Sequence, residues 1–240
     1  MFVDSSALPE QVVHDAIYSA FNSAGQRCSA LRLLCIQEEI EPRTLDLLKG
    51  YMEELTIGDP RHLSTDVGPC IDDPSRKILG AHVDRMGSEQ KIIHRCALPD
   101  GSGAGTYFSP TLVEIDDIAA LTEEQFGPIL HVVKFRSRDL DKTVARVNAT
   151  GFGLTMGLHS RIDSRVRGLA ADSGAGNLYV NRNMIGAVVG VQPFGGRGLS
   201  GTGPKAGGPH YVQRFGTEFT LSNNISAVGG NASLLTLGSD

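Results

Sequence analysis

One cysteine in this chain stands in a setting that is typical of a nucleophile. The stretch FNSAGQRCSALR, residues 21–32, places Cys28 shortly after Gly25 and directly before an apolar segment. At a tight turn the backbone N–H of such a cysteine can point at a developing oxyanion, which is why a glycine is expected just before it. An arbitrary cysteine is more often a small buried apolar side chain. The accompanying motifs therefore decide the reading of Cys28.

A second compact motif places an acid and an aromatic residue in front of a turn. The sequence EEQFGPI, residues 123–129, contains Glu124, Phe126, Gly127 and Pro128. Taken alone, this motif reads as a solvated acid before the turn into a strand. The presence of Cys28 upstream favours a functional reading.

A third segment, residues 186–208, is dense in glycine, a composition that supports turns and close backbone approach rather than regular structure. The spacing of Gly196, Gly198 and Gly201 fits the Gly-x-Gly-x-x-Gly pattern of dinucleotide sites. That fingerprint requires a helix immediately afterwards to offer its N-terminus to phosphate, and Pro204 among further glycines does not provide one. We therefore reject a dinucleotide-binding role for this loop, and a long ordered loop of this kind usually has another function.

The elements that must position these residues alternate along the chain. Apolar residues recur with helical or strand-like spacing, which predicts an α/β domain with a largely parallel, twisted sheet covered by helices. The predicted helices are residues 9–24, 43–55, 74–86, 140–148 and 164–172. The predicted strands are residues 31–37, 91–97, 108–115, 129–135, 155–159 and 177–181, with a further strand at 216–222 before a polar tail.

The composition is that of an ordinary globular protein. The 240 residues are 40% hydrophobic and 20% charged, which allows a sizeable buried core. The 22 basic and 27 acidic residues give a net charge of −5 without a basic run, so the chain lacks the electrostatic footprint of a nucleic-acid binder. No apolar stretch approaches the roughly 20 residues that span a bilayer, and residues 1–10 lack a signal-peptide pattern. We therefore expect a cytoplasmic protein.

The remaining cysteines and the histidines give no further site. Cys35, Cys70 and Cys96 lack a glycine turn or polar neighbours, so we expect them to be reduced and structural. The seven histidines lack metal-ligand spacing, and we expect no metal site. A cysteine paired with a histidine could still form a hydrolase or acyltransferase, since the sequence alone does not show which histidine lies beside Cys28. That reading leaves the motif at residues 123–129 unexplained.

Together the motifs resemble the aldehyde dehydrogenase superfamily. Gly25, Gln26 and Cys28 occupy the positions of its active-site cysteine signature, residues 123–129 resemble its Glu-x-Phe-Gly-Pro motif, and the sequence PFGG resembles its loop near the substrate entrance. The resemblance implies a catalytic domain that oxidises aldehydes with NAD or NADP. The thiol would form a thiohemiacetal, a hydride would pass to the nicotinamide, and water would cleave the thioester.

The resemblance also implies roles for two residues of the second motif. Glu124 and Phe126 would contact the cofactor, which is chemically sensible. A carboxylate accepts hydrogen bonds from ribose hydroxyls, and an aromatic side chain supports one edge of a nicotinamide ring.

The sequence KAGGPHYVQRF is similar to the glutamate semialdehyde dehydrogenases, in particular to this domain in bifunctional proline-degrading enzymes of bacteria. The resemblance implies that Ser29, Gly207 and Gly208 hold the substrate carboxylate, since N–H groups at paired glycines can wrap an anion closely. Phe215 would form an aromatic wall for the aliphatic chain. Arg27, beside the thiol, could add positive potential, although an exposed arginine is more often only solvated.

The resemblance matches the C-terminal half of a complete aldehyde dehydrogenase. It implies a thiol-bearing catalytic domain at residues 1–215 and an oligomerisation strand and tail at residues 216–240. The family's dinucleotide-binding Rossmann domain, its oxyanion-hole asparagine and its general base all precede the point that matches Met1, and Asp4, Glu38 and Glu39 do not stand in the position of that base. We therefore expect a fragment that is inactive by itself, whose parent could also carry an FAD-dependent proline dehydrogenase domain upstream.

Two other readings stay open. The chain could be a natural truncated protein that acts as an interaction module and pairs its strand at residues 216–222 with a partner subunit. It could also belong to a dehydrogenase of the same superfamily that acts on a different aldehyde. The choice between NAD and NADP is open as well.

Overall fold

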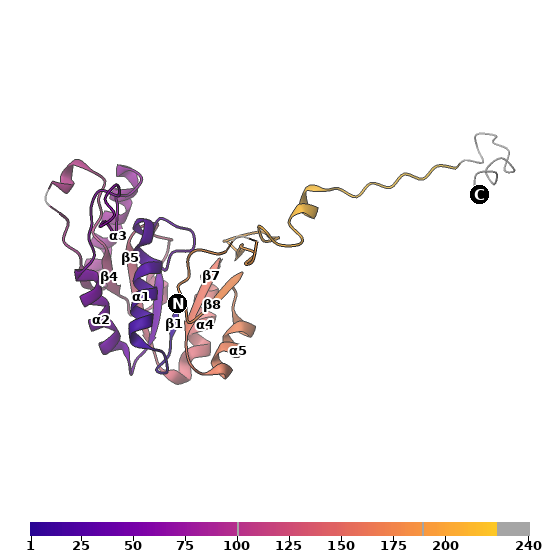
Figure 1. Ribbon diagram of the computed structural model, residues 1–240. Helices are drawn as coiled ribbons and strands as arrows, with labels where there is room; N and C mark the ends of the chain where they lie inside the picture. The colour runs from indigo at the N-terminus through magenta and orange to yellow at the C-terminus, as the bar shows by residue number, and fades with distance from the viewer. Residues whose placement is uncertain (100, 189, 225–240) are drawn as a thin grey trace.

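The sheet at the centre of the protein has seven strands, in the order β3-β4-β5-β2-β1-β7-β8. The computed structural model describes residues 1–99, 101–188 and 190–224 (Figure 1). All neighbouring strands are parallel except β3 and β4, which confirms the predicted α/β fold. The strands are β1 (Phe2–Val3), β2 (Leu33–Gln37), β3 (Lys91–Arg95), β4 (Thr111–Glu114), β5 (Ile129–Phe135), β7 (Thr155–His159) and β8 (Asn177–Val180).

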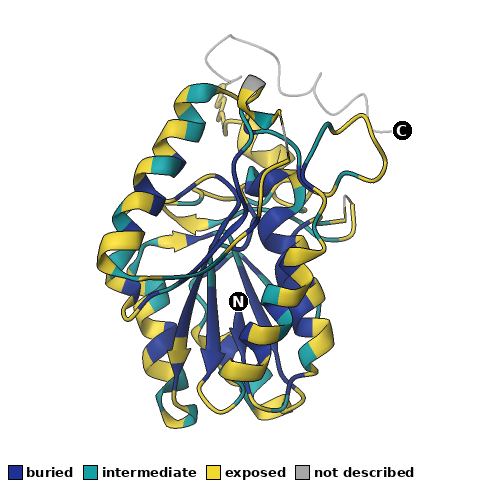
Figure 2. Cartoon of the chain, turned by 90° about the vertical axis from the view of Figure 1, so that its left-hand side faces the viewer, coloured by how far each residue is buried: buried dark blue, intermediate teal, exposed yellow. Residues whose placement is uncertain are grey.

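Helices cover both faces of this sheet. Alternate strand residues point to opposite sides, so Leu34 and Ile36 pack in one core cluster while Cys35 packs in the other. The first cluster also contains the apolar residues of α1 (Pro9–Phe21) and α2 (Glu41–Glu53). The second contains those of α3 (Asp73–Glu89), α4 (Leu140–Ala149) and α5 (Asp163–Asp172). Figure 2 shows the buried strands between helices whose outer sides are exposed.

Local sequence sets where the helices begin. The α3 helix is capped by Asp72, whose Oδ1 accepts a hydrogen bond of 2.8 Å from the backbone N–H of Ser75. Proline lies in the first turn of α1, α2 and α3, where its missing N–H has no partner to lose. The predicted helices and strands before residue 182 exist, with ends that shift by a few residues.

The first helix ends earlier than its apolar pattern predicts. We expected a helix over residues 9–24, but α1 stops at Phe21 and a short 3-10 turn (Asn22–Gly25) follows. Ser23 and Ala24 take positive φ angles of 55° and 53°, and Gly25 follows at 63°. Three successive left-handed residues reverse the direction of the chain, so the helix cannot continue.

A small second sheet fixes the glycine-rich loop. The strands β6 (Phe152–Gly153) and β9 (Arg197–Gly198) pair antiparallel, and the sequence pattern predicted neither of them. The rest of the loop is irregular, as expected. In the described part of the chain, the only helical element after Gly201 is the 3-10 turn η5 (Val212–Phe215). These residues therefore present no helix N-terminus directly after Gly201 of the kind that a dinucleotide fingerprint requires.

The strand predicted at residues 216–222 does not form within this chain. Residues 216–224 have no regular secondary structure, and Figure 1 shows this segment running away from the body of the molecule. Phe219 and Leu221 are 87% and 80% exposed. A strand requires a hydrogen-bonded neighbour, and within the described part of the chain no strand pairs with residues 216–222. Residues 225–240 of the predicted tail lie outside the described residues.

A search of the described helices finds none with the length and apolar character needed to cross a membrane.

Candidate active site

The thiol and the acidic motif meet at the amino ends of two neighbouring strands. Cys28 lies shortly before β2, and the motif with Glu124 ends directly before β5. These strands pair in parallel, with Leu33 opposite His131, so the segments that enter them lie at the same edge of the sheet. Strand order therefore unites two motifs that are far apart in the sequence.

Gly25 is the point of closest contact between the two motifs. A Cβ atom added to Gly25 would lie 2.2 Å from the carbonyl oxygen of Gly127 and 2.8 Å from that of Ala20. Both atoms belong to the backbone, so they cannot move aside as a flexible side chain does. The glycine predicted before the thiol is thus required both by its positive φ and by the adjacent motif.

Arg32 ties the backbone of the two motifs together. Its Nη1 donates hydrogen bonds of 2.6 Å to the Gly25 carbonyl and 3.1 Å to the Gly127 carbonyl. Its Nη2 donates one of 3.1 Å to the carbonyl of Arg27, next to the thiol. One planar guanidinium thereby fixes the turn that carries Cys28 against the turn that leads into β5.

The same guanidinium also contacts both predicted cofactor residues. Arg32 Nε lies 3.5 Å from Glu124 Oε1, and the guanidinium carbon lies 4.8 Å from the centre of the Phe126 ring. Burial lowers the pKa of Arg32, while Glu124 and a Cys28 thiolate each act to raise it. Arg32 is therefore within electrostatic reach of the nucleophile.

Gln26 anchors the other side of the thiol turn. Its Oε1 accepts a hydrogen bond of 2.8 Å from the backbone N–H of Ile71, and its Nε2 donates one of 3.3 Å to the Pro69 carbonyl. The cysteine signature thus includes a glutamine because its amide can both donate and accept toward one loop.

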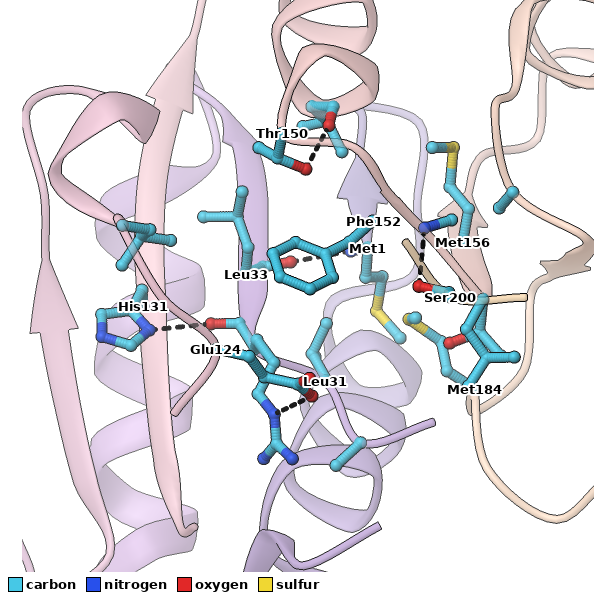
Figure 3. Close-up of a pocket in the computed structure, with 18 of the residues that line it drawn as sticks. Met1, Leu31, Leu33, Glu124, His131, Thr150, Phe152, Met156, Met184 and Ser200 are labelled. Carbon is cyan, nitrogen blue, oxygen red and sulfur yellow. Dashed lines mark hydrogen bonds and ion pairs between the residues drawn. The ribbon is translucent and has the colours of Figure 1, made fainter. Parts of the chain in front are cut away.

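Cys28 lines two cavities. The first, of about 320 Å³, is lined by Cys28 and Glu124 together with mainly apolar side chains, and Figure 3 shows how several of them surround it. In that view Met184 lies on the side opposite His131, and the Phe152 ring lies between them. The second cavity, of about 600 Å³, is lined by Cys28, Ser29 and residues of the glycine-rich loop.

Some of the predicted substrate residues line the second cavity and others do not. Arg27, buried Ser29 and Gly207 all line the second cavity beside the thiol. Gly208 does not line it, and its backbone N–H donates a hydrogen bond of 3.0 Å to the Lys205 carbonyl. Phe215 is 77% exposed and lines neither cavity. In this arrangement three of the predicted contacts surround one space with Cys28, whereas Gly208 is adjacent and Phe215 lies apart.

The four thiols differ in exposure, and all of them are free. Cys28 is exposed, while Cys35, Cys70 and Cys96 are buried. Burial raises the pKa of Cys35 and of Cys96 to about 11, and it also raises the pKa of Cys70. These three remain protonated near neutral pH and unreactive, as predicted for structural cysteines.

The histidines do not favour a cysteine–histidine hydrolase. His131 shares the first cavity with Cys28, but its ring nitrogens contact the Arg32 carbonyl and His82. Among the residues that the structure describes, no hydrogen bond joins a histidine to Cys28, and no group of three or more acidic, histidine or cysteine side chains could hold a metal ion.

Sequence reasoning missed Arg32 and His131. The only available signals were single polar residues inside apolar runs, since Arg32 interrupts the stretch LRLLCI and His131 interrupts ILHVVKF. A charged or imidazole side chain that enters a core in this way needs a partner. The partners are backbone carbonyls that only the folded arrangement brings near.

Comparison with known proteins agrees with this geometry. The chain is 52% identical over 220 residues to the bifunctional protein PutA of Escherichia coli (strain K12), an alignment that covers 90% of this chain and 17% of that protein. A crystal structure of bifunctional proline utilization A matches with a TM-score of 0.88 and 50% identity, covering 95% of this chain and 23% of that one. A 1-pyrroline-5-carboxylate dehydrogenase from Thermus with bound NAD matches with a TM-score of 0.82 and 30% identity, covering 89% and 41%.

The chain therefore spans less than half the length of each of these relatives. The sequence profile of the aldehyde dehydrogenase family matches residues 1–219, which include the Cys28 turn, the Glu124 motif and the glycine-rich loop. With these motifs assembled around one exposed thiol, the chain belongs to the aldehyde dehydrogenase family.

Proposed function

We propose that this chain supplies the thiol-bearing part of an NAD-dependent dehydrogenase that oxidises L-glutamate γ-semialdehyde to L-glutamate in proline catabolism. The observation that carries the proposal is the position of Cys28, which lines both cavities. Glu124 lines the first of these cavities, and Ser29 and Gly207 line the second. The names of the relatives support the substrate, because 1-pyrroline-5-carboxylate opens with water to this semialdehyde.

In this mechanism the Cys28 thiolate adds to the aldehyde carbon, and the carbonyl oxygen takes the negative charge. The backbone N–H of Cys28 stabilises this oxyanion at the tight turn, which the Arg32 guanidinium holds in place through the carbonyls of Gly25 and Arg27. When the carbonyl reforms, the hydrogen on that carbon leaves with its electron pair and a thioester remains on Cys28. Water then cleaves the thioester, which releases the carboxylic acid and restores the thiol.

Glu124 lines the first cavity and Phe126 lines neither cavity, but both side chains are accessible to the expected cofactor. The Glu124 side chain is 37% exposed, and Arg32 approaches only one of its oxygens, so the carboxylate can accept from ribose hydroxyls. Phe126 is 45% exposed and offers a ring edge to a planar group. NAD, when bound here, supplies the acceptor for the hydride, and the NAD-bound Thermus structure supports NAD rather than NADP.

The second cavity fits the semialdehyde in this proposal. Ser29 and Gly207 contribute a hydroxyl and a backbone N–H beside the thiol, and Arg27 adds positive charge toward the substrate carboxylate. We retain Gly208 as a contact through the shape of the loop, because its own N–H is used by the Lys205 carbonyl. Phe215 can serve as a wall only if its segment folds back over the cavity.

The domain assignment is part of the same proposal. Residues 1–215 form the thiol-bearing domain, and residues 216–240 form the oligomerisation strand and tail. The greater length of the relatives supports a parent protein that supplies the dinucleotide-binding domain and the general base, and in which FAD serves a proline dehydrogenase domain. The four free thiols support a reducing, cytoplasmic setting for that parent.

The test uses a chimera in which this chain replaces the matched 220 residues of the Escherichia coli relative. We expect the chimera, supplied with NAD, to oxidise glutamate semialdehyde, and Gly208→Leu to lower kcat/KM for this acidic aldehyde by about 10 to 100-fold while changing that for propanal by about twofold. An added Cβ on Gly208 would lie 3.0 Å from the Lys205 carbonyl oxygen and 3.4 Å from Pro193 Cβ, so a bulky side chain must displace the loop.

A matched control is Gly168→Leu on α5, where an added Cβ has no neighbour within 4 Å. This variant should leave kcat/KM unchanged for both glutamate semialdehyde and propanal. Equal losses for propanal and the semialdehyde in the Gly208→Leu chimera would contradict the carboxylate assignment, and a folded chimera without NAD reduction would contradict the proposed activity.

An oligomerisation role for residues 216–222 rests on the exposure of Phe219 and Leu221 and on the fact that, among the residues the structure describes, no strand pairs with this segment. Ending the chain after residue 215 should convert an oligomer to a monomer in sedimentation velocity. Substituting Phe219→Asp alone should weaken the association in the same direction. If both variants kept the oligomeric state of the unmodified chain in sedimentation velocity, the proposed oligomerisation role would be wrong.

A further inference from the structure

Two buried histidines lie directly beneath the site. His82 on α3 and His131 on β5 are 6% and 1% exposed, and their Nε2 atoms are 2.8 Å apart. The rings are nearly perpendicular, at 85°, with centres 5.1 Å apart. The mechanism above uses neither ring. A buried imidazole pair of this kind requires a defined arrangement of protons.

The contacts fix that arrangement. His131 Nδ1 lies 3.0 Å from the Arg32 carbonyl oxygen, which only accepts, so Nδ1 of His131 must carry the proton. In a neutral ring the Nε2 of His131 is then an acceptor. His82 must donate from its own Nε2, and its Nδ1 carries no proton. Each ring therefore has one tautomer, and the two tautomers are opposite.

Charge around the pair keeps both rings neutral. Burial lowers the pKa of His82 and of His131 to about 4, and Arg85 on α3 acts in the same direction on both. Arg32 adds to this effect on His131 from the other side. A protonated His131 that donated from both nitrogens would place a second buried cation next to Arg32, so the neutral arrangement prevails near pH 7.

His131 holds the Arg32 peptide through two of its nitrogen atoms. The Arg32 carbonyl oxygen accepts a hydrogen bond of 3.0 Å from the backbone N–H of His131, and Nδ1 of the His131 ring lies 3.0 Å from the same oxygen. Arg32 is also the residue whose side chain binds the Gly25 and Gly127 carbonyls. The orientation of that guanidinium thus depends on a peptide that the histidine ring fixes.

We propose that His82 and His131 form a positioning pair for the thiol site, in which His82 sets the tautomer of His131 and His131 holds the Arg32 peptide so that its guanidinium spans the Cys28 turn and the Glu124 motif. The proposal rests on the proposed role of Cys28 as the nucleophile. It adds two residues to the site that act on the thiol through Arg32, and one of them, His131, also lines the first cavity.

The first test is nitrogen-15 NMR of the imidazole rings in the 240-residue chain. The expected spectrum shows His131 protonated on Nδ1 and His82 protonated on Nε2 at pH 7, and the His131→Asn variant identifies the signals. In His82→Leu, His131 Nε2 loses its partner, so the His131 signals should shift toward those of a ring that averages between its two tautomers. The reverse tautomers, or rapid averaging in the unmodified chain, would overturn the proposal.

The second test measures the rate at which iodoacetamide alkylates Cys28 in the same chain. His131→Leu removes the ring donor to the Arg32 carbonyl and should slow alkylation about tenfold, because a small displacement of a reactive group has a large effect on rate. His131→Asn keeps a donor near the Nδ1 position and should restore the rate to within about threefold. His82→Gln, which keeps a donor near Nε2, should likewise react faster than His82→Leu.

Val83→Ala is the control, because Val83 neighbours His82 on α3 and is buried in the core without contacting Arg32 through a hydrogen bond. It destabilises the same helix, so it shows the effect of a purely structural loss. Equal slowing in Val83→Ala and His131→Leu, or no rescue by His131→Asn, would overturn the proposal. Neither test needs NAD or aldehyde turnover, so a failure of the proposed function would be seen separately in the chimera.

Discussion

Replacing Cys28 by alanine in the chimera is expected to lower NAD reduction with glutamate semialdehyde by at least about 10³-fold. The loss is large because no thiohemiacetal or thioester can form without the thiol. The measurement is the initial rate of NADH formation, with aldehyde-free samples as background. Alkylation of the unmodified chimera by iodoacetamide should abolish the activity in parallel with the labelling of Cys28.

Cys35→Ala is the matched control for this prediction. Cys35 is buried, and its pKa is raised to about 11, so it should neither be alkylated readily nor contribute to turnover. We expect its activity to stay within about threefold of the unmodified chimera once folding is verified by circular dichroism. A Cys28→Ala chimera that retained a tenth or more of the activity would show that another group is the nucleophile.

Replacing Gly25 by alanine is expected to reduce the free energy of unfolding of the 240-residue chain by at least about 3 kcal/mol. The new Cβ would lie 2.2 Å from the Gly127 carbonyl oxygen, and the residue would have to keep a φ of 63°. Relief requires the thiol turn to move away from the Glu124 motif, so alkylation of Cys28 should change as well. The measurement is urea unfolding followed by circular dichroism.

Gly50→Ala is the matched comparison, because we expect it to change the free energy of unfolding in the opposite direction. Gly50 lies in α2, and an added Cβ there has no neighbour within 4 Å. Alanine should therefore stabilise the helix by about 0.5 to 1 kcal/mol. Equal stabilities for Gly25→Ala and Gly50→Ala would show that the thiol turn does not depend on the close contact with Gly127. If Gly25→Ala does not fold, it will show no cooperative thermal unfolding transition, whereas Gly50→Ala will, and this difference ranks the two variants.

The regular part of the fold was largely predictable from the sequence. Residues 129–135 and 155–159 were predicted as strands, and β5 and β7 have these bounds, because β-branched or apolar runs there end at clear turn signals. The strands β1, β6 and β9 have two residues each and are too short to leave a pattern. The left-handed turn at Ser23 and Ala24 could not be predicted either, because neither residue type favours a positive φ angle.

The site was predictable as two motifs but not as one assembly. Cys28 and Glu124 were recognisable from their neighbours in sequence, whereas their proximity depends on β2 and β5 being adjacent. Arg32 could not be assigned because its partners are carbonyl groups of Gly25, Gly127 and Arg27, and a backbone carbonyl has no residue-specific signal. The placement of Phe215 likewise depends on a segment that has no regular structure beyond η5.

Cys28 lies at the amino ends of β2 and β5, so insertions and labels should be tolerated better at the carboxyl ends of these strands than at their amino ends. Open α/β sheets usually bind their ligands beyond the carboxyl ends of the strands. Here β2 and β5 point away from Cys28, so the turns after Gln37 and Phe135 lie about 20 Å from the site across the sheet. A dye, an affinity tag or an inserted domain placed at residues 136–139 can therefore report on the chain while leaving its nucleophile undisturbed.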